Sequence, residues 1–214
     1  MFELDVVEDD SLARFLPRWY GPPDRPAPSQ PPASLRPPRS PSLPEPLDEW
    51  YRLTDRWSLP ICRDHVFRPA EELDCTADLV DFWHTDDGSE RYAYDAEGYV
   101  FERGIPTAIP LRRFLVYIAV FEAVYAPIHG LVHLDVAPNV LAEVTGRLLP
   151  LSDPLWQWPD PALRYYADDD LLVHAGTSAD SNQGGGRLVV SARHRDALGR
   201  FDGYDLDWLW DSRA

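Results

Sequence analysis

Lysine is absent from this chain of 214 residues, so all 20 of its basic residues are arginines. Acidic residues number 36, which leaves a formal net charge of −16 at pH 7. A surface with this charge repels phosphate backbones and anionic lipid head groups. The charge therefore argues against nucleic acid and membranes as partners and favours a basic protein.

Cysteine is also scarce, since Cys62 and Cys75 are the only two. They form no C-x-x-C pair, and we expect two buried thiols, with no metal site. The N-terminal MFELDVVEDD lacks the basic and apolar regions of a secretory signal. The most apolar helix candidate, 114–128, contains Glu122 and is shorter than the roughly 20 residues that span a bilayer. These absences predict a cytoplasmic protein.

Proline, in contrast, is abundant, and residues 17–46 hold 12 of the 22 prolines. Because proline fixes φ and removes a hydrogen-bond donor, we expect residues 21–43 to form an extended tether outside any sheet. Residues 1–20 contain a short amphipathic helix from Asp10 to Tyr20. A helix this short is unstable alone, so it should dock on the body of the protein, residues 44–214.

The body has the element order helix, strands, helix, strands, which is typical of an α+β fold. Helices are expected from Ser42, from Pro110 to Ala126 and from Pro138, and the second is apolar nearly all round and therefore buried. An edge strand is expected in HVFRPAEEL with a helical turn at 69–74, and a meander at 79–84, 91–95 and 99–102, joined by glycine-containing turns. The C-terminal third predicts two strands around an acidic turn, a strand in RLVVSAR, a short helix in HRDALGRF and a terminal DLDWLW. We predict an antiparallel or mixed sheet flanked by helices.

Several of these segments carry a family resemblance in their order and spacing. They are FLPRWYGPP, LPEPLDEWYRL, LVDFWHTDDGSERYAYD, PLRRFLVYIAVFEAV, and RYYADDDLLVHA followed by RLVVSARHRDAL and LDWLW. Together they resemble the SUKH superfamily, bacterial immunity proteins related to fungal cell-wall assembly regulators, and in particular its longer actinobacterial-type members. The resemblance covers most of residues 44–210. It implies an α+β fold that neutralises a toxin by binding it, with no shared catalytic centre and no cofactor.

The run DFWHTDDGSERYAYD offers a candidate site. His84 with Asp86, Asp87 and Glu90 has the residue types of a metal or acid–base site. However, Asp-Asp-Gly is the composition of a tight turn whose carboxylates bind their own backbone. An exposed acidic turn flanked by Trp83 and Tyr92 is also a candidate partner-binding surface, because aromatic residues supply contact area and acids steer a basic partner.

A second acidic turn contains Asp168, Asp169 and Asp170, which repel one another and should be solvated. It lacks the later glutamate of a calcium loop, so exposed charge or contact with a toxin are the two interpretations. Glu122 should lie at a wet helix edge or be buried beside an arginine such as Arg112 or Arg113.

Other patterns receive structural interpretations. His129 and His133 have the spacing of helical zinc ligands, but Gly130 breaks the helix and favours a helix-exit loop. The Gly-rich stretch at 181–187 lacks the lysine of a phosphate loop and predicts a hairpin connection. Ser191 with His194 and Asp196 lacks the G-x-S-x-G motif, so we assign no catalytic triad.

We expect a non-enzymatic immunity protein without cofactor or metal, either a monomer or a weak homodimer, that binds a basic toxin such as a nuclease. The alternatives are a regulatory or scaffolding module of the same fold, in which the proline-rich segment docks on aromatic grooves, and an enzyme that uses His84 or the 129–133 histidines.

Overall fold

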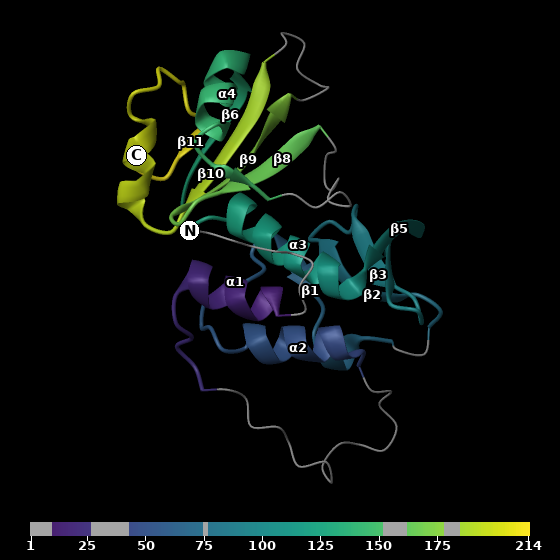
Figure 1. Ribbon diagram of the computed structural model, residues 1–214. Helices are drawn as coiled ribbons and strands as arrows, with labels where there is room; N and C mark the ends of the chain where they lie inside the picture. The colour runs from purple at the N-terminus through teal and green to yellow at the C-terminus, as the bar shows by residue number, and fades with distance from the viewer. Residues whose placement is uncertain (1–9, 27–42, 75–76, 152–161, 178–184) are drawn as a thin grey trace. The chain divides into compact units, whose positions relative to one another are not determined.

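The computed structural model describes residues 10–26, 43–74, 77–151, 162–177 and 185–214. They form an α+β fold with two antiparallel sheets, which confirms the predicted fold class. The chain divides into two compact units, Glu8–Glu122 and Ala123–Ala214. The boundary lies inside a helix, within residues 44–214, which were predicted to form one domain. Figure 1 shows the elements of each unit, and most of the proline-rich tether (27–42) lies outside the described residues.

The N-terminal unit contains a five-stranded antiparallel sheet with the strand order β1-β2-β3-β4-β5. Its strands are β1 (His65–Phe67), β2 (Val80–Thr85), β3 (Arg91–Tyr94), β4 (Tyr99–Glu102) and β5 (Ile105–Pro110). The helices are α1 (Ser11–Tyr20), α2 (Glu45–Thr54), the 3-10 turn η2 (Ala70–Glu72), and α3 (Leu111–Tyr125) as far as Glu122. The predicted edge strand, helical turn and meander are confirmed.

Turn chemistry and apolar burial explain this sheet. Gly88, Gly98 and Gly104 have positive φ at the hairpin connections, a conformation that glycine adopts without a steric penalty. The ring of Phe114 on α3 packs within 6.1 Å of the Trp83 ring and 5.2 Å of the Tyr92 ring, measured between centroids. The apolar helix predicted from Pro110 is thus confirmed as a core element of this unit.

The N-terminal helix packs on α2. Phe15 and Leu16 are buried on α1, and Leu47 and Trp50 are buried on α2. The apolar face of α1 thus packs against α2, as expected for a short amphipathic helix that is unstable alone. The predicted cap of α2, Ser42, lies outside the described residues.

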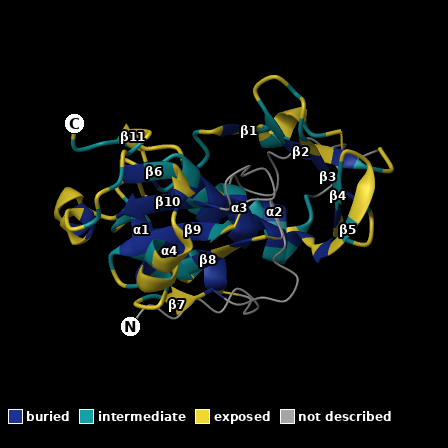
Figure 2. Cartoon of the chain, turned by 90° about the horizontal axis from the view of Figure 1, so that it is seen from above, coloured by how far each residue is buried: buried dark blue, intermediate teal, exposed yellow. Residues whose placement is uncertain are grey.

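The C-terminal unit contains a six-stranded antiparallel sheet with the order β11-β6-β10-β9-β8-β7. Its strands are β6 (His129–Val136), β7 (Leu149–Pro150), β8 (Leu163–Ala167), β9 (Leu171–Thr177), β10 (Gly186–Ala192) and β11 (Trp210–Asp211). The helix α4 (Pro138–Thr145) and the 3-10 helix η3 (Arg195–Phe201) pack against this sheet. Figure 2 shows the central strands β9 and β10 coloured mostly as buried. The hairpin around the acidic turn, the strand after it and the two short helices were predicted.

The strands β5 and β6 were missed, as was the two-residue strand β7. The strand β6 was expected as a helix-exit loop, and this prediction is wrong because Leu131 and Val136 pack in the core with Val190 of the paired strand β10. The strand β5 contains Pro106 and Pro110, which argue against a central strand, but β5 is an edge strand where the missing N–H is tolerated.

Candidate functional site

Glu122 is the one buried carboxylate among the described residues, with 0% of its surface exposed. Its Oε2 accepts hydrogen bonds from the backbone N–H of Arg63 at 2.8 Å and of Asp64 at 3.0 Å. The expected partner Arg112 is wrong, because that side chain donates to Glu45 and, at 2.7 Å, to Glu49 on α2. Glu122 therefore fixes the loop that leads into β1.

His65 stands beside this carboxylate. Its Nδ1 lies 3.3 Å from Glu122 Oε1, although the direction of the contact is not that of a hydrogen bond. The ring stacks on Trp83 with 4.4 Å between centroids. Burial lowers the pKa of His65, but the contact with Glu122 and the negative charges of Glu122 and Asp64 outweigh it, so the pKa is raised above 6.5. The positive charge that His65 gains on protonation is therefore compensated by the buried carboxylate of Glu122.

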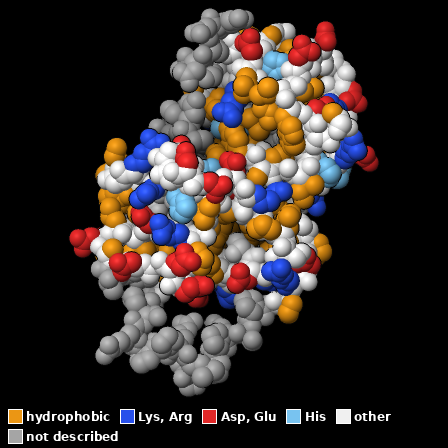
Figure 3. All heavy atoms as spheres, turned by 180° about the vertical axis from the view of Figure 1, so that it is seen from behind, with side chains coloured by type: hydrophobic (Ala, Val, Ile, Leu, Met, Phe, Trp, Pro, Cys, Tyr) orange, Lys and Arg blue, Asp and Glu red, His pale blue; other side chains and the backbone are white. Residues whose placement is uncertain are grey.

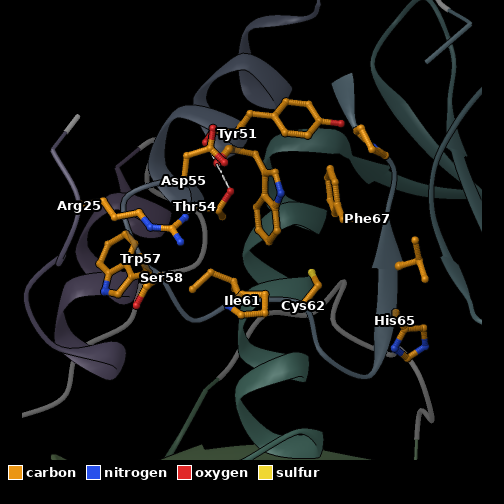
Figure 4. A pocket seen from close by; sticks show the side chains of 14 residues that line it. Arg25, Tyr51, Thr54, Asp55, Trp57, Ser58, Ile61, Cys62, His65 and Phe67 are labelled. Atoms are coloured by element: carbon orange, nitrogen blue, oxygen red, sulfur yellow. Dashed lines mark hydrogen bonds between the residues drawn. The ribbon is translucent and has the colours of Figure 1, made fainter. Parts of the chain in front are cut away.

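A cavity of about 650 Å³ lies between α2 and β1, within the volume range of ligand pockets. Figure 4 shows Tyr51 and Phe67 in its aromatic wall. The Trp50 ring stacks on Phe67 with 4.8 Å between centroids. Tyr51 meets the Phe67 ring edge-on at 5.5 Å and donates a 2.6 Å hydrogen bond to the carbonyl of Arg68. Trp57 Nε1 donates to the Gly21 carbonyl at 3.1 Å. These contacts fix the wall, but Trp50 and Trp57 are themselves buried.

Cys62 and His65 both line this cavity. A cysteine beside a histidine can act as a nucleophile that the histidine activates as a base. Burial raises the pKa of the Cys62 thiol well above its usual value, and the nearby charge of Glu122 raises it further. The two side chains do not point toward one another in Figure 4. The thiol is therefore protonated and is not paired with the imidazole.

The predicted acidic turn at 86–90 is a self-capped hairpin turn. Asp87 Oδ1 accepts hydrogen bonds from the backbone N–H of Ser89 at 2.9 Å and from Thr85 Oγ1 at 2.7 Å, and these bonds lower the pKa of Asp87 to about 2. Asp86 is exposed, and Glu90 lies 3.7 Å from Arg103. The carboxylates of Asp86 and Asp87 thus lie at the surface. The low pKa of Asp87 keeps its carboxylate ionised at neutral pH.

The aromatic residues beside this turn are not at the surface. Trp83 and Tyr92 are each 0% exposed, with their ring centroids 4.8 Å apart. The expectation that they serve as surface anchors for a partner is corrected, because the side of the sheet that carries them faces α3. The alternation of apolar and polar residues along β2 does not predict this burial. Phe82 and Trp83 are consecutive and both buried, because the pairing of β2 with β3 is irregular between Asp81 and Trp83.

The second acidic turn belongs to the C-terminal unit and binds a cation from its own chain. Asp168 forms an ion pair with Arg200, whose Nη2 also lies 3.1 Å from Asp170 Oδ2. Asp168 Oδ1 accepts the backbone N–H groups of Asp170 at 2.8 Å and Leu171 at 2.9 Å. Asp169 is exposed. Arg200 therefore compensates part of the predicted negative charge of this turn.

The other histidine candidates do not assemble a metal site. His129 and His133 lie on β6, and His133 Nδ1 accepts the backbone N–H of Asp135 at 3.0 Å. His84 Nδ1 lies 2.8 Å from the carbonyl oxygen of Thr85. In the part of the chain that the structure describes, no group of three or more His, Cys, Asp or Glu side chains could hold a metal ion.

His174 is buried in the C-terminal unit and was not predicted as a candidate residue. Its Nδ1 lies 2.5 Å from the hydroxyl of Tyr125, and its ring stacks on Tyr165 at 4.1 Å. Burial and the nearby charge of Arg187 lower its pKa to about 3. The imidazole is therefore neutral at physiological pH. The polar cluster could not be predicted from the sequence, because the neighbours of His174 in LLVHAG are apolar.

Comparison of the chain with family models, curated proteins and solved structures finds no match. The resemblance to the SUKH superfamily thus stays a prediction. Within the described ranges, none of the helices has both the length and the apolar character needed to cross a membrane.

Proposed function

We propose that this protein is an immunity-type protein that neutralises a cognate toxin by stoichiometric binding. The observation that supports it best is the placement of the carboxylates. Of the acidic side chains that the structure describes, only Glu122 is buried, while the net charge of the chain is −16. Carboxylates at the surface of such a chain raise the rate of encounter with a positively charged protein.

The same charge supports a nuclease as the toxin class. A nuclease binds phosphate backbones and carries a basic surface for that purpose. An acidic protein competes for that surface, and its charge accelerates association. Asp86 and Asp87 in the first turn and Asp169 in the second have exposed side chains at the surface of this chain. The resemblance to SUKH immunity proteins supports the same function.

Toxicity rescue tests the proposal. If a neighbouring gene encodes a large secreted toxin, that toxin would be expressed in a host together with the chain, and we expect growth to be restored and the two proteins to co-purify in a fixed ratio. A neighbouring gene that encodes no such toxin, or a toxin domain that kills cells equally with and without the chain, contradicts the proposal.

The proline-rich composition of residues 27–41 favours a second candidate function, a scaffolding module, because proline-rich segments dock on aromatic-lined grooves of partner proteins. Deleting residues 27–41 should spare toxin protection but abolish scaffolding. The deletion leaves α1 intact, which matters because Phe15 and Leu16 are buried.

A further inference from the structure

The C-terminal unit displays large apolar side chains around its two-residue strand β11. Leu209 is 69% exposed and Trp210 is 42% exposed, and Leu134 on the neighbouring strand β6 is also exposed. We call these three residues the β11 patch. Figure 3 shows hydrophobic side chains gathered on the side of the molecule turned away from the viewer in Figure 1, with carboxylates beside them. Exposed tryptophan is uncommon on a monomer, and tryptophan is enriched among the residues that dominate protein interfaces.

The backbone that carries this patch is fixed to β6. The Leu209 N–H donates to the carbonyl of Val132 at 2.8 Å, and the Ser212 N–H donates to the carbonyl of Gly130 at 3.1 Å. Ser212 Oγ in turn accepts the Gly130 N–H at 2.9 Å. The exposed side chains therefore stand on a segment whose backbone is already ordered.

The C-terminal arginine fixes the same segment from the other side. Arg213 Nη2 lies 2.7 Å from Asp211 Oδ2, and Arg213 Nη1 donates to the carbonyl of Leu198 at 3.2 Å and also pairs with Asp202. A surface that is ordered before binding loses less conformational entropy when a partner covers it. The patch is thus a preorganised surface.

Gly130 allows the indole of Trp210 to lie against β6. A Cβ at this position would meet the Trp210 ring at 2.9 Å and the carbonyl oxygen of Val190 at 2.6 Å. The position of the ring is therefore set by close contact with the strand, although much of the ring remains exposed.

The charged residues near the β11 patch indicate which kind of partner would bind there. Asp135 follows Leu134 in the chain, and Asp205 and Asp207 precede Leu209; all three are exposed. Arg213 is already held by carboxylates of its own segment. A second copy of the chain would bring another net charge of −16 to the same surface. The local charge therefore favours a basic partner over self-association.

We propose that the β11 patch is the docking surface for a positively charged protein, whose apolar side chains cover Leu209 and Trp210. This inference rests on the proposed function and names the surface that performs it. Carboxylates at the edge steer the partner, and the tryptophan anchors it.

The test uses the full-length chain and a matched pair of variants. Leu209→Glu changes the patch, and Ile105→Glu makes the same change at an equally exposed residue of β5, since both side chains are 69% exposed. The probe is a short peptide that alternates arginine with leucine. Controls are peptides that replace arginine by glutamate, or leucine by serine. Binding is read from the NMR signal of the Trp210 indole N–H, assigned with Trp210→Phe.

We expect the arginine–leucine peptide to shift the Trp210 signal and both control peptides to bind more weakly. Leu209→Glu should weaken binding about tenfold or more, as loss of an interface anchor does, while Ile105→Glu binds like the unmodified chain. Equal binding by the two variants, preference for the glutamate peptide, or self-association that Leu209→Glu abolishes would each overturn the inference.

The cognate toxin separates this inference from the proposed function. If the unmodified chain rescues cells and Leu209→Glu rescues equally well, the docking surface is wrong and the function stands. If the unmodified chain fails to rescue, the proposed function itself is wrong.

Discussion

Replacing Glu122 by alanine should destabilise the N-terminal unit far more than any surface carboxylate does. The change removes the acceptor of two backbone N–H groups, those of Arg63 and Asp64. Leaving a buried donor unsatisfied costs about 1–3 kcal/mol each. The change also leaves His65 without its anionic neighbour, and breaking a buried pair typically costs about 3–5 kcal/mol. We expect a loss of about 3–5 kcal/mol in the free energy of unfolding, since these contributions overlap.

The assay is urea unfolding followed by the NMR signals of Trp50 and Trp83, which report on this unit. The matched control is Glu45→Ala, because Glu45 pairs with Arg112 but its side chain is 71% exposed. An exposed pair contributes about 0–1 kcal/mol. The unfolding midpoint should fall strongly for the first variant and little for the second, with an unchanged slope. Equal shifts for the two variants would refute the role assigned to Glu122.

The pH dependence of the same pair follows from the raised pKa of His65. A native state with a raised pKa binds more protons than the unfolded state, so stability falls as pH rises. The contribution is complete below the ordinary value of 6.5 and is lost as pH rises through the native pKa. Glu122→Gln keeps the shape and removes the charge, so the decline above pH 6.5 should flatten in this variant.

Three further changes test other parts of the structure. His174→Phe should flatten the loss of stability that we expect in the parent as pH falls from 6.5 toward about 3. It should also lower the free energy of unfolding by about 1 kcal/mol, because the contact with Tyr125 is lost. Thermal unfolding at several pH values measures both effects. Gly130→Ala should cost about 1–3 kcal/mol and displace the Trp210 indole, since its Cβ would overlap a backbone carbonyl; an unchanged melting temperature contradicts this. In a Cys75→Ser variant, Cys62 should react slowly with iodoacetamide at neutral pH until the chain is unfolded, and rapid alkylation of the native variant would show that the Cys62 thiol is accessible and ionised.

Most of the elements could be predicted because their signals are local. The meander follows from glycine in the turns and from alternating apolar residues, and α3 follows from an apolar run of helical length. The strand β6 was missed because glycine and two histidines interrupt its pattern. Its burial depends on pairing with β10, more than fifty residues later in the chain.

The candidate site was less accessible to sequence reasoning, because its contacts are distant along the chain. Arg200 neutralises Asp168 across 32 residues, and Glu122 binds the backbone of Arg63 across 59. The composition of a turn shows that its carboxylates are near water, but it does not show which cation reaches them. Likewise, the burial of Trp83 depends on α3 and not on its neighbours in β2.

The central claim is that the exposed carboxylates attract a basic protein, and the association rate as a function of ionic strength tests it most directly. Stopped-flow mixing of the chain with its toxin should give a rate constant that falls steeply as salt rises from about 0.01 to about 1 M, because the screening length shrinks from about 30 to about 3 Å. A rate constant that stays constant over this range would contradict the account.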